Sequence, residues 1–376
     1  MNADSSLDGT VAGQTGSVDV EASGLGYAAG RITSAGPIAN GNGDVATPLP
    51  SNESLAHQPA ALPHSDHDQS KQSLLGTSLA PVLLHVCQGR LTDLHWFRTD
   101  WQRGGAVTGY ATYADDDGQP HDVVVKMPVP PCERHWLAHL GEVGEVAPRV
   151  FAHGEMLGGY DLAWVVMERL THGPLGPQWN GREFDLLAEA AGRFYAASRN
   201  VPLAGDPMLR DWDAVYERAR KAVRDSHVPQ AQRWRTVLKK AHRKLNGWLK
   251  QWHDRPIEDW CHGDLHLGNA MTRDPAPDGP ALLFDFAHTR VGHWVEDAVY
   301  FEHLFWARRD RLNGRKVCRL IAQQRKQHGL PVGSDWPALA QIKRNLLAIS
   351  APAQLVHHGD PLHLHAALDV LEASAA

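Results

Sequence analysis

Cysteine is scarce in this sequence, with four residues among 376, and none of them forms a CxxC pair: Cys87, Cys132, Cys261 and Cys318. This spacing predicts neither a zinc site nor a disulfide framework, so we expect reduced thiols. Long apolar runs are also missing, since no stretch reaches the roughly 18 residues of a membrane span. The first residues lack the basic and apolar regions of a signal peptide. These absences predict a cytoplasmic protein that does not enter a membrane.

Positive charge is in short supply as well. The chain has 37 Lys and Arg against 43 Asp and Glu, a formal net charge of −6. It shows no basic patch of the kind that nucleic acid requires, so we expect no nucleic-acid partner. A mildly acidic surface would tolerate a cationic small molecule. With 43% hydrophobic residues, the chain can bury a sizeable core, and its length suggests two lobes.

Residues 1–75 contain few large apolar side chains and no hydrophobic periodicity. They are rich in Gly, Ala, Ser, Asn and Asp. Such a segment cannot bury enough surface to offset the entropy lost on ordering. We therefore predict a disordered N-terminal extension over 1–75.

An ordered region with strand-like patterns follows. Residues 79–87 fit either a short helix or a strand, and strands are predicted over 95–101, 106–113 and 122–126. Gly104 and Gly105 form a turn that either joins a hairpin or aims backbone N–H groups at phosphates. Lys126 ends a three-valine strand, where it is either a solvated lysine or a phosphate ligand.

A helix is predicted over 133–142, where apolar residues recur at helical spacing. Glu133 lies in its first turn, a place where a carboxylate is favoured by the helix dipole or serves as a cap. It is also the best-placed partner for Lys126. Glu142 and Glu145 are less suitable because they fall near the end of the helix.

The second half of the chain is predicted to be mainly helical. An apolar strand over 162–167 precedes Glu168 and Leu170. Helices are then expected over 183–199, 211–252 with a break at Val228–Pro229, 302–329, 336–349 and 355–373. The Arg and Lys residues between 218 and 244 are interpreted as a solvated face, with anion binding as the alternative.

The stretch from Trp260 to Phe286 carries the most chemistry. It contains His262-Gly263-Asp264, then Asn269, and an apolar strand over 281–284 that ends at Asp285. Residues 274–280 have turn chemistry, so 270–284 should form a hairpin. Pairing residue 273 with residue 281 places Asn269 opposite Asp285. Oxygen-bearing side chains that converge in this way suit Mg²⁺.

Two other interpretations of the same stretch remain open. Asp and Asn residues that flank a hairpin are often only turn formers. If residues 262–266 were extended, His262, Asp264 and His266 would share one face and could hold a metal ion for hydrolysis.

The pattern H-x-D-x-x-x-x-N followed by D-F resembles the catalytic loop and metal aspartate of kinases. The HGD and DFA forms resemble the aminoglycoside phosphotransferase / choline kinase-like family. This resemblance implies an α+β, two-lobed protein-kinase-like fold. The nucleotide-binding N-lobe, a small antiparallel sheet with one helix, would span 76–170. The larger, mostly helical C-lobe would span 171–376, with a catalytic loop at 262–269 and a metal-site strand at 281–286.

The resemblance also implies roles for single residues in catalysis and metal binding. Asp264 would act as the catalytic base, and His262 would brace its loop. Asn269 and Asp285 would hold Mg²⁺. Asp297 matches an aspartate that supports the catalytic loop, although this chain departs from the family pattern at His293 and Trp294, which replace an aspartate and a proline.

ATP contacts follow from the same resemblance. Lys126, paired with Glu133, would neutralise the α- and β-phosphates, and Gly104 and Gly105 would cover them. The backbone of residues 168 and 170 would meet the adenine.

Together these features predict an ATP-dependent phosphotransferase that moves the γ-phosphate to a hydroxyl group of a small molecule. A nucleotide-binding pseudokinase is the first alternative, and a metal-dependent hydrolase is the second. Trp260, Trp294 and Trp306 are either core residues or the walls of a cation pocket.

Overall fold

The computed structural model describes residues 69–97, 106–142, 144–176, 181–276, 278–355 and 360–375. Most of the predicted extension, residues 1–68, lies outside these ranges. Its last seven residues begin helix α1 (Gln69–Val86). The segment 79–87, which the sequence left open between helix and strand, therefore belongs almost wholly to a helix that starts earlier than expected.

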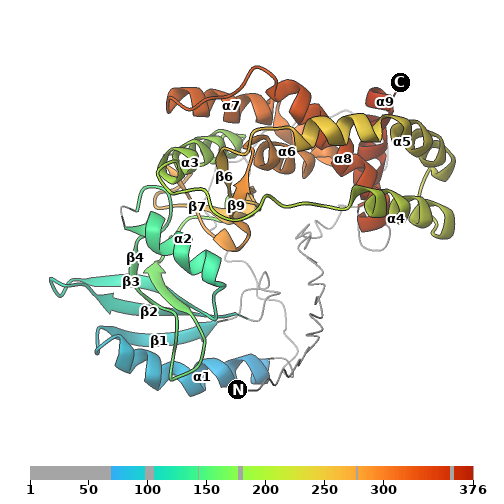
Figure 1. Ribbon diagram of the computed structural model, residues 1–376. Helices are drawn as coiled ribbons and strands as arrows, with labels where there is room; N and C mark the ends of the chain where they lie inside the picture. Colours follow the sequence, from blue (N-terminus) through green and yellow to red (C-terminus); the bar gives the residue numbers. More distant parts are fainter. Residues whose placement is uncertain are drawn as a thin grey trace, which may run out of the picture. The chain divides into compact units, whose positions relative to one another are not determined.

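A five-stranded antiparallel sheet forms the first part of the fold, with strand order β1-β2-β3-β5-β4 (Figure 1). The strands are β1 (Leu91–Phe97), β2 (Val107–Ala114), β3 (Pro120–Met127), β4 (Val150–Gly154) and β5 (Trp164–Glu168). Strand β3 is central because it pairs with both β2 and β5. Lys126 stands near its end, opposite Thr108 and Val165.

The two faces of this sheet carry different helices because side chains alternate along β3. Val123 and Val125 are fully buried in a cluster with Leu79 and Leu83 of α1. Lys126 therefore points to the opposite face, where its ammonium group meets helix α2 (Pro131–Gly141). The sequence predicted one helix beside the sheet, and the structure adds α1 as a second.

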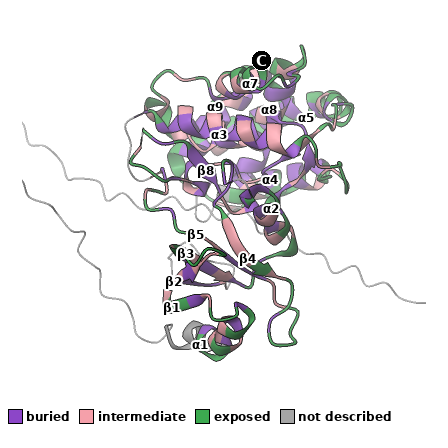
Figure 2. Cartoon of the chain, turned by 90° about the vertical axis from the view of Figure 1, so that its left-hand side faces the viewer, coloured by how far each residue is buried: buried purple, intermediate pink, exposed green. Residues whose placement is uncertain are grey.

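The second part of the fold is mostly helical, as the hydrophobic periodicity predicted. The main helices are α3 (Glu183–Ser198), α4 (Trp212–Asp225), α5 (Ala231–His253), α6 (Val295–His303), α7 (Val317–Gln327), α8 (Trp336–Leu355) and α9 (Pro361–Ala375), with a short 3-10 segment at Trp306–Leu312. Buried residues gather where these helices pack together (Figure 2). Asp211 caps α4, since its Oδ1 accepts a hydrogen bond of 2.9 Å from the backbone N–H of Ala214. None of the helices in the described ranges is both long enough and apolar enough to cross a membrane.

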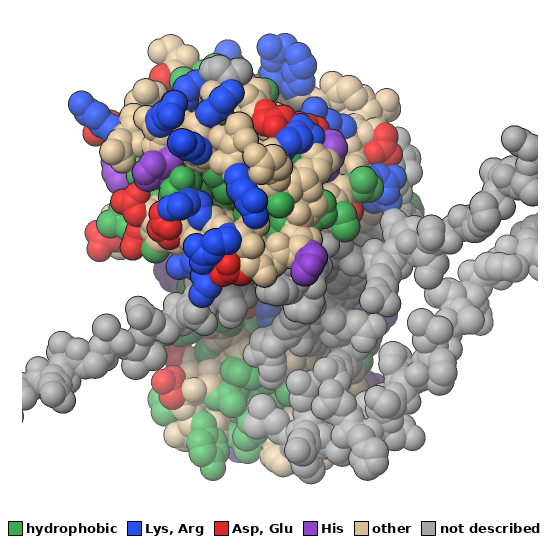
Figure 3. Space-filling view, turned by 90° about the vertical axis from the view of Figure 1, so that its right-hand side faces the viewer, with side chains coloured by type: hydrophobic (Ala, Val, Ile, Leu, Met, Phe, Trp, Pro, Cys, Tyr) green, Lys and Arg blue, Asp and Glu red, His purple; other side chains and the backbone are tan. Residues whose placement is uncertain are grey.

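The exposed face of α5 is basic. Figure 3 shows many Lys and Arg side chains on the face of the helical part that it views. Arg235, Lys239, Lys240 and Arg243 belong to this helix and are exposed to solvent. The opposite face, with Trp234, is buried, so α5 is amphipathic with its charges outside, as predicted.

Two short antiparallel strand pairs lie between α5 and α6. Strand β6 (Asp259–Cys261) pairs with β9 (Arg290–Gly292), and β7 (Ala270–Thr272) pairs with β8 (Ala281–Leu283). The 3-10 turns Leu267–Asn269 and Phe286–His288 flank the second pair.

The predicted register of the β7–β8 hairpin was wrong by one residue. Ala270 pairs with Leu283, where the prediction paired it with Phe284. The reason is that Arg273 does not continue the strand, so the connection is one residue longer than the turn chemistry suggested. Asn269 therefore lies opposite Phe284, whose N–H donates to the Asn269 carbonyl at 3.2 Å. The next residue, Asp285, leaves the strand with φ of 62°.

Candidate active site

The loop that follows β6 is held by a carboxylate from α6. Asp297 Oδ2 accepts from the His262 N–H at 2.8 Å, and its Oδ1 accepts from the Gly263 N–H at 2.9 Å. The Tyr195 hydroxyl donates to Oδ2 at 3.0 Å. Gly263 has φ of 83°, and a Cβ there would lie 2.1 Å from the carbonyl oxygen of His288. Only glycine permits this bend, which turns the next residue, Asp264, away from the strand.

The ring of His262 is fully buried, and hydrogen bonds fix its orientation. Its Nε2 lies 3.1 Å from the Phe284 carbonyl oxygen, and its Nδ1 accepts from the Asp264 N–H at 3.3 Å. A carbonyl only accepts, so Nε2 carries the proton and the ring is the neutral tautomer. Burial also lowers the pKa of His262. This ring orients the loop and has no nitrogen left for a metal ion.

The alternative of a His262-Asp264-His266 metal cluster does not fit this geometry. It required an extended segment, and the bend at Gly263 breaks the alternation of side chains. Within the described ranges, no group of three His, Cys, Asp or Glu side chains is arranged to hold a metal ion.

Three side chains surround the Asp264 carboxylate. The Tyr300 hydroxyl donates to Oδ1 at 2.5 Å, and the Asn269 amide donates to Oδ2 at 3.1 Å. His266 Nε2 lies 3.4 Å from Oδ2. Burial alone would raise the pKa of Asp264, but the contacts with His266 and Tyr300 outweigh it and hold the pKa well below its usual range. Asp264 is therefore ionised near neutral pH and is a weak base.

Lys126 and Glu133 form an ion pair on the sheet face that carries α2. The Lys126 Nζ lies 2.6 Å from Glu133 Oε1, and the Glu133 side chain is 2% exposed. This is the pairing that the sequence suggested. Burial raises the pKa of Glu133, Lys126 opposes the rise, and the nearby charge of Asp285 adds to it. The second oxygen of Glu133, Oε2, is buried and has no hydrogen-bond partner among the described residues.

Asn269 and Asp285 have the chemistry of magnesium ligands. The amide nitrogen of Asn269 is used toward Asp264, so its oxygen is the atom that could face a cation. The charge of Asp285 acts on both Glu133 and His262, so Asp285 lies near each of them. An amide oxygen and a carboxylate suit Mg²⁺, which takes one or two protein ligands beside water and phosphate oxygens.

The segment that joins the two parts of the fold is fixed by Glu168 and Arg273. The Glu168 N–H donates to the Arg149 carbonyl at 2.8 Å, and the Arg149 N–H donates at 3.1 Å to the Glu168 carboxylate, not to its carbonyl. The Glu168 carboxylate also accepts from Arg273 at 2.6 and 2.8 Å. Arg273, from the end of β7, thus ties the helical part to the sheet beside Leu170. We did not anticipate this role for Arg273.

The other predicted residues have mixed outcomes. Gly104 and Gly105 lie outside the described residues. Trp294 and Trp306 are buried, which supports the core interpretation for these two. Trp260 is half-buried and packs edge-on against Trp136 with ring centroids 5.0 Å apart. Tyr300 was missed, although its spacing of three from Asp297 on a helix places both on one face.

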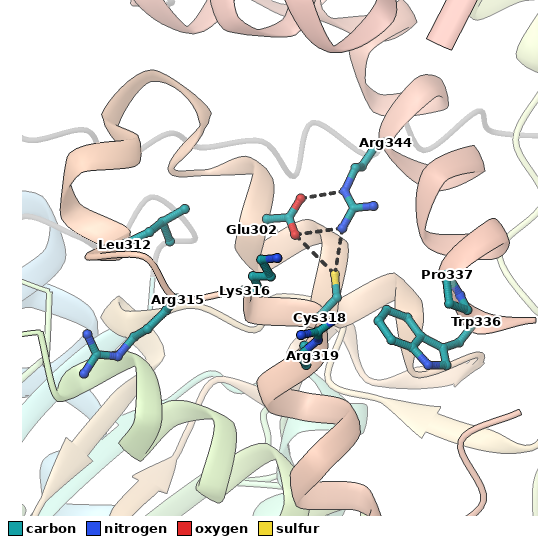
Figure 4. A pocket seen from close by; sticks show the side chains of 9 residues that line it. All are labelled: Glu302, Leu312, Arg315, Lys316, Cys318, Arg319, Trp336, Pro337 and Arg344. Atoms are coloured by element: carbon teal, nitrogen blue, oxygen red, sulfur yellow. Dashed lines mark hydrogen bonds and ion pairs between the residues drawn. The ribbon is translucent and has the colours of Figure 1, made fainter. Parts of the chain in front are cut away.

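A separate cavity of about 260 Å³ lies near α7 and α8 (Figure 4). Figure 4 shows Glu302 joined to both Arg344 and Cys318, and Arg344 donates to its carboxylate at 2.6 and 2.8 Å. None of the predicted site residues lines this cavity. It is distinct from the arrangement around Asp264.

The antiparallel sheet with its buried lysine–glutamate pair, followed by a helical region with an HGD loop, defines a protein with a protein-kinase-like fold. A comparison with family models supports this class, because residues 109–341 match the phosphotransferase enzyme family. The chain belongs to this family. A search of the curated proteins gave no match.

The solved structures that match this chain include proteins named as phosphotransferases and small-molecule kinases. A protein from Ralstonia eutropha JMP134, whose name provisionally assigns it to the aminoglycoside phosphotransferases, is 16% identical at a TM-score of 0.51 and covers 79% of this chain and 97% of its own. A microcompartment-associated aminopropanol kinase is 15% identical, with a TM-score of 0.49, over 75% and 90% of the two chains. Choline kinase from Cryptosporidium parvum Iowa II is 10% identical, with a TM-score of 0.46, over 78% and 95%. At such identities the first of these likenesses supports the fold alone.

Proposed function

We propose that this protein transfers the γ-phosphoryl group of ATP to a hydroxyl group of a small molecule, with Mg²⁺ bound beside the phosphates. The observation that carries the proposal is the ion pair between Lys126 and Glu133. A lysine fixed by a buried glutamate at the end of a central strand is the phosphate-binding device of kinases. Hydrolysis at a histidine cluster would have no use for it. In this proposal residues 76–170 form the nucleotide-binding lobe and residues 171–376 the catalytic lobe.

ATP would bind between the connecting segment and the catalytic loop. The carbonyl of Glu168 and the N–H of Leu170 are suited to the adenine edge, because the Glu168 N–H is already used within the sheet. Lys126 would neutralise the α- and β-phosphates. Asn269 and Asp285 would hold the Mg²⁺ ion, which supplies positive charge to the phosphate oxygens.

Asp264 would orient the acceptor hydroxyl toward the γ-phosphorus. In the transfer the bond from the acceptor oxygen to phosphorus forms, the bond to the ADP oxygen breaks, and the hydroxyl proton passes to Asp264. The transition state of such transfers is loose, so positioning and charge neutralisation matter more than basicity. This agrees with a carboxylate that three hydrogen-bond donors make a weak base.

The alternative of a pseudokinase has less support. A module that only binds nucleotide would need Lys126 and Asp285 but would not need an oriented carboxylate at Asp264. We also propose the cytoplasm as its place of action, because it supplies Mg²⁺·ATP and keeps thiols such as Cys261 free.

Replacing Asp264 by alanine tests the proposal. We expect the rate of ADP formation from Mg²⁺·ATP, measured with and without small hydroxylated amines, to fall by about 10²- to 10⁴-fold. The dissociation constant of Mg²⁺·ATP should change by no more than about twofold, since Asp264 would not bind the nucleotide. Asp213→Ala, an exposed change on α4, is the matched control and should leave both quantities unchanged. An Asp264→Ala variant that turns over at the wild-type rate would show that this carboxylate is not catalytic.

A further inference from the structure

The hydrogen bonds around Asp264 leave one direction of approach to its carboxylate. An ionised carboxylate offers about four lone-pair positions on its two oxygens. Within the described residues, Oδ2 faces two donors, Asn269 and His266, and Oδ1 faces one, the Tyr300 hydroxyl. The remaining position is therefore on Oδ1, beside Tyr300.

The two donors on Oδ2 belong to the catalytic loop itself. His266 Nδ1 accepts from the Gly268 N–H at 2.9 Å, so its Nε2 carries the proton that faces Asp264. Asn269 is 7% exposed, and its amide also donates to the Asp264 carbonyl at 3.0 Å. Both donors are fixed by these local bonds, so Oδ2 is closed to an incoming hydroxyl.

Tyr300 comes from another element and has different access. It lies on α6, three residues after Asp297, which holds the backbone of the same loop. Residues three apart share a face of a helix. One face of α6 therefore holds the loop in two ways. Asp297 bonds to the backbone of the loop, and Tyr300 bonds to the Asp264 carboxylate. Tyr300 is only half-buried, so part of this residue remains accessible to solvent.

We propose that Tyr300 is a positioning residue that selects Oδ1 of Asp264 as the atom that receives the acceptor hydroxyl. This inference rests on the proposed function. The phenol holds the carboxylate against rotation, and the acceptor donates to the remaining lone pair of Oδ1. The acceptor oxygen then lies next to the Tyr300 ring, so this side chain also forms one wall of the acceptor site.

Tyr300→Phe removes only the hydroxyl and tests this role, with water as the acceptor. We expect the kcat for hydrolysis of Mg²⁺·ATP to fall about tenfold, because small errors of position are costly in group transfer. The KM for Mg²⁺·ATP should stay within about twofold. A purely structural role would change KM and the melting temperature together with kcat. Tyr216→Phe, on α4 against the ring of His242, is the control. An unchanged kcat in Tyr300→Phe would overturn the proposal.

A second measurement does not depend on catalysis. The ¹³Cζ resonance of Tyr300, assigned by its loss in Tyr300→Phe, should shift when Asp264 is replaced by asparagine, because the hydroxyl loses a charged acceptor. A wild-type protein that neither binds nor hydrolyses Mg²⁺·ATP would contradict the proposed function. The NMR signal would still decide whether Tyr300 is bonded to Asp264. A resonance that does not respond would overturn the positioning role by itself.

Discussion

The carboxylate of Glu133 is almost completely buried, and its direct hydrogen-bond partner is Lys126. The side chain of Glu133 is 2% exposed and that of Lys126 is 17% exposed. Removing one partner of a buried ion pair lowers the free energy of unfolding far more than removing one partner of an exposed pair, because the remaining charge stays desolvated. The pair therefore serves stability, in addition to the nucleotide binding that we propose for it.

Lys126→Met should lower the free energy of unfolding by about 3 kcal/mol at pH 7, since Glu133 would remain buried without its counter-charge. The loss should be smaller at pH 5. The pKa of Glu133 is already raised by burial, and removal of Lys126 raises it further. A raised pKa in the folded state means that stability is present at low pH and is lost as pH rises through that pKa. Urea unfolding at both pH values measures the difference.

The double variant Lys126→Met/Glu133→Gln is the control for this prediction. This variant removes both the ammonium group of Lys126 and the charge of Glu133, so most of the lost free energy of unfolding should return. Its affinity for Mg²⁺·ATP should stay low. An equal loss of stability at pH 5 and pH 7 in Lys126→Met would contradict the buried-charge explanation.

Single residues also show where prediction from sequence ended. Local patterns and motif spacing mark five residues as candidates for the site, and these remain predictions: Lys126, Glu133, Asp264, Asn269 and Asp285. The partners of Tyr300 and Arg273 depend on which elements meet in space. Arg273 contacts Glu168, 105 positions earlier in the chain, and no local pattern indicates such a contact.

At the scale of elements, α6 and the loop that carries Asp264 act as one unit. Asp297 supplies both oxygens to two backbone N–H groups of the loop, and its own side chain is 1% exposed. A buried N–H without an acceptor costs about 1–3 kcal/mol. The loop is thus shaped by α6 as well as by its own sequence.

Asp297→Ala should reduce the free energy of unfolding by about 2–5 kcal/mol, because the buried N–H of His262 and the part-buried N–H of Gly263 would lose their acceptors. The kcat should fall as well, since the loop would no longer hold Asp264 in place. Asp297→Asn keeps one acceptor oxygen and should give an intermediate loss. Chemical denaturation of the three proteins measures the effect. An alanine variant as stable as the wild type would show that α6 does not support the loop.

Elements were mostly predictable, and their pairing was less so. Period-two and helical patterns located the strands of the sheet and the long helices, because burial of one face dictates both periods. The β7–β8 register failed because turn residues do not reveal where a strand ends. An arginine such as Arg273 could continue a strand. Here its side chain donates to the Glu168 carboxylate, which lies outside the hairpin.

At the scale of the whole molecule, the proposed nucleotide site takes residues from both the sheet and the helical part. Lys126 and Glu133 come from the first part, and Asn269 and Asp285 from the second. A ligand that binds both parts of the native state must stabilise the fold by mass action. In the proposed site, the contribution of Asp285 to this effect depends on the metal ion.

The most direct test is the melting temperature with and without Mg²⁺·ATP, for the wild type and for Asp285→Ala. At a ligand concentration about 100 times the dissociation constant, binding adds about 2.7 kcal/mol and should raise the wild-type midpoint by several degrees. ATP with excess EDTA should raise it much less. Asp285→Ala should lose most of the Mg²⁺-dependent rise. No rise in the wild type at millimolar Mg²⁺·ATP, or an equal rise in Asp285→Ala, would contradict the nucleotide site described here.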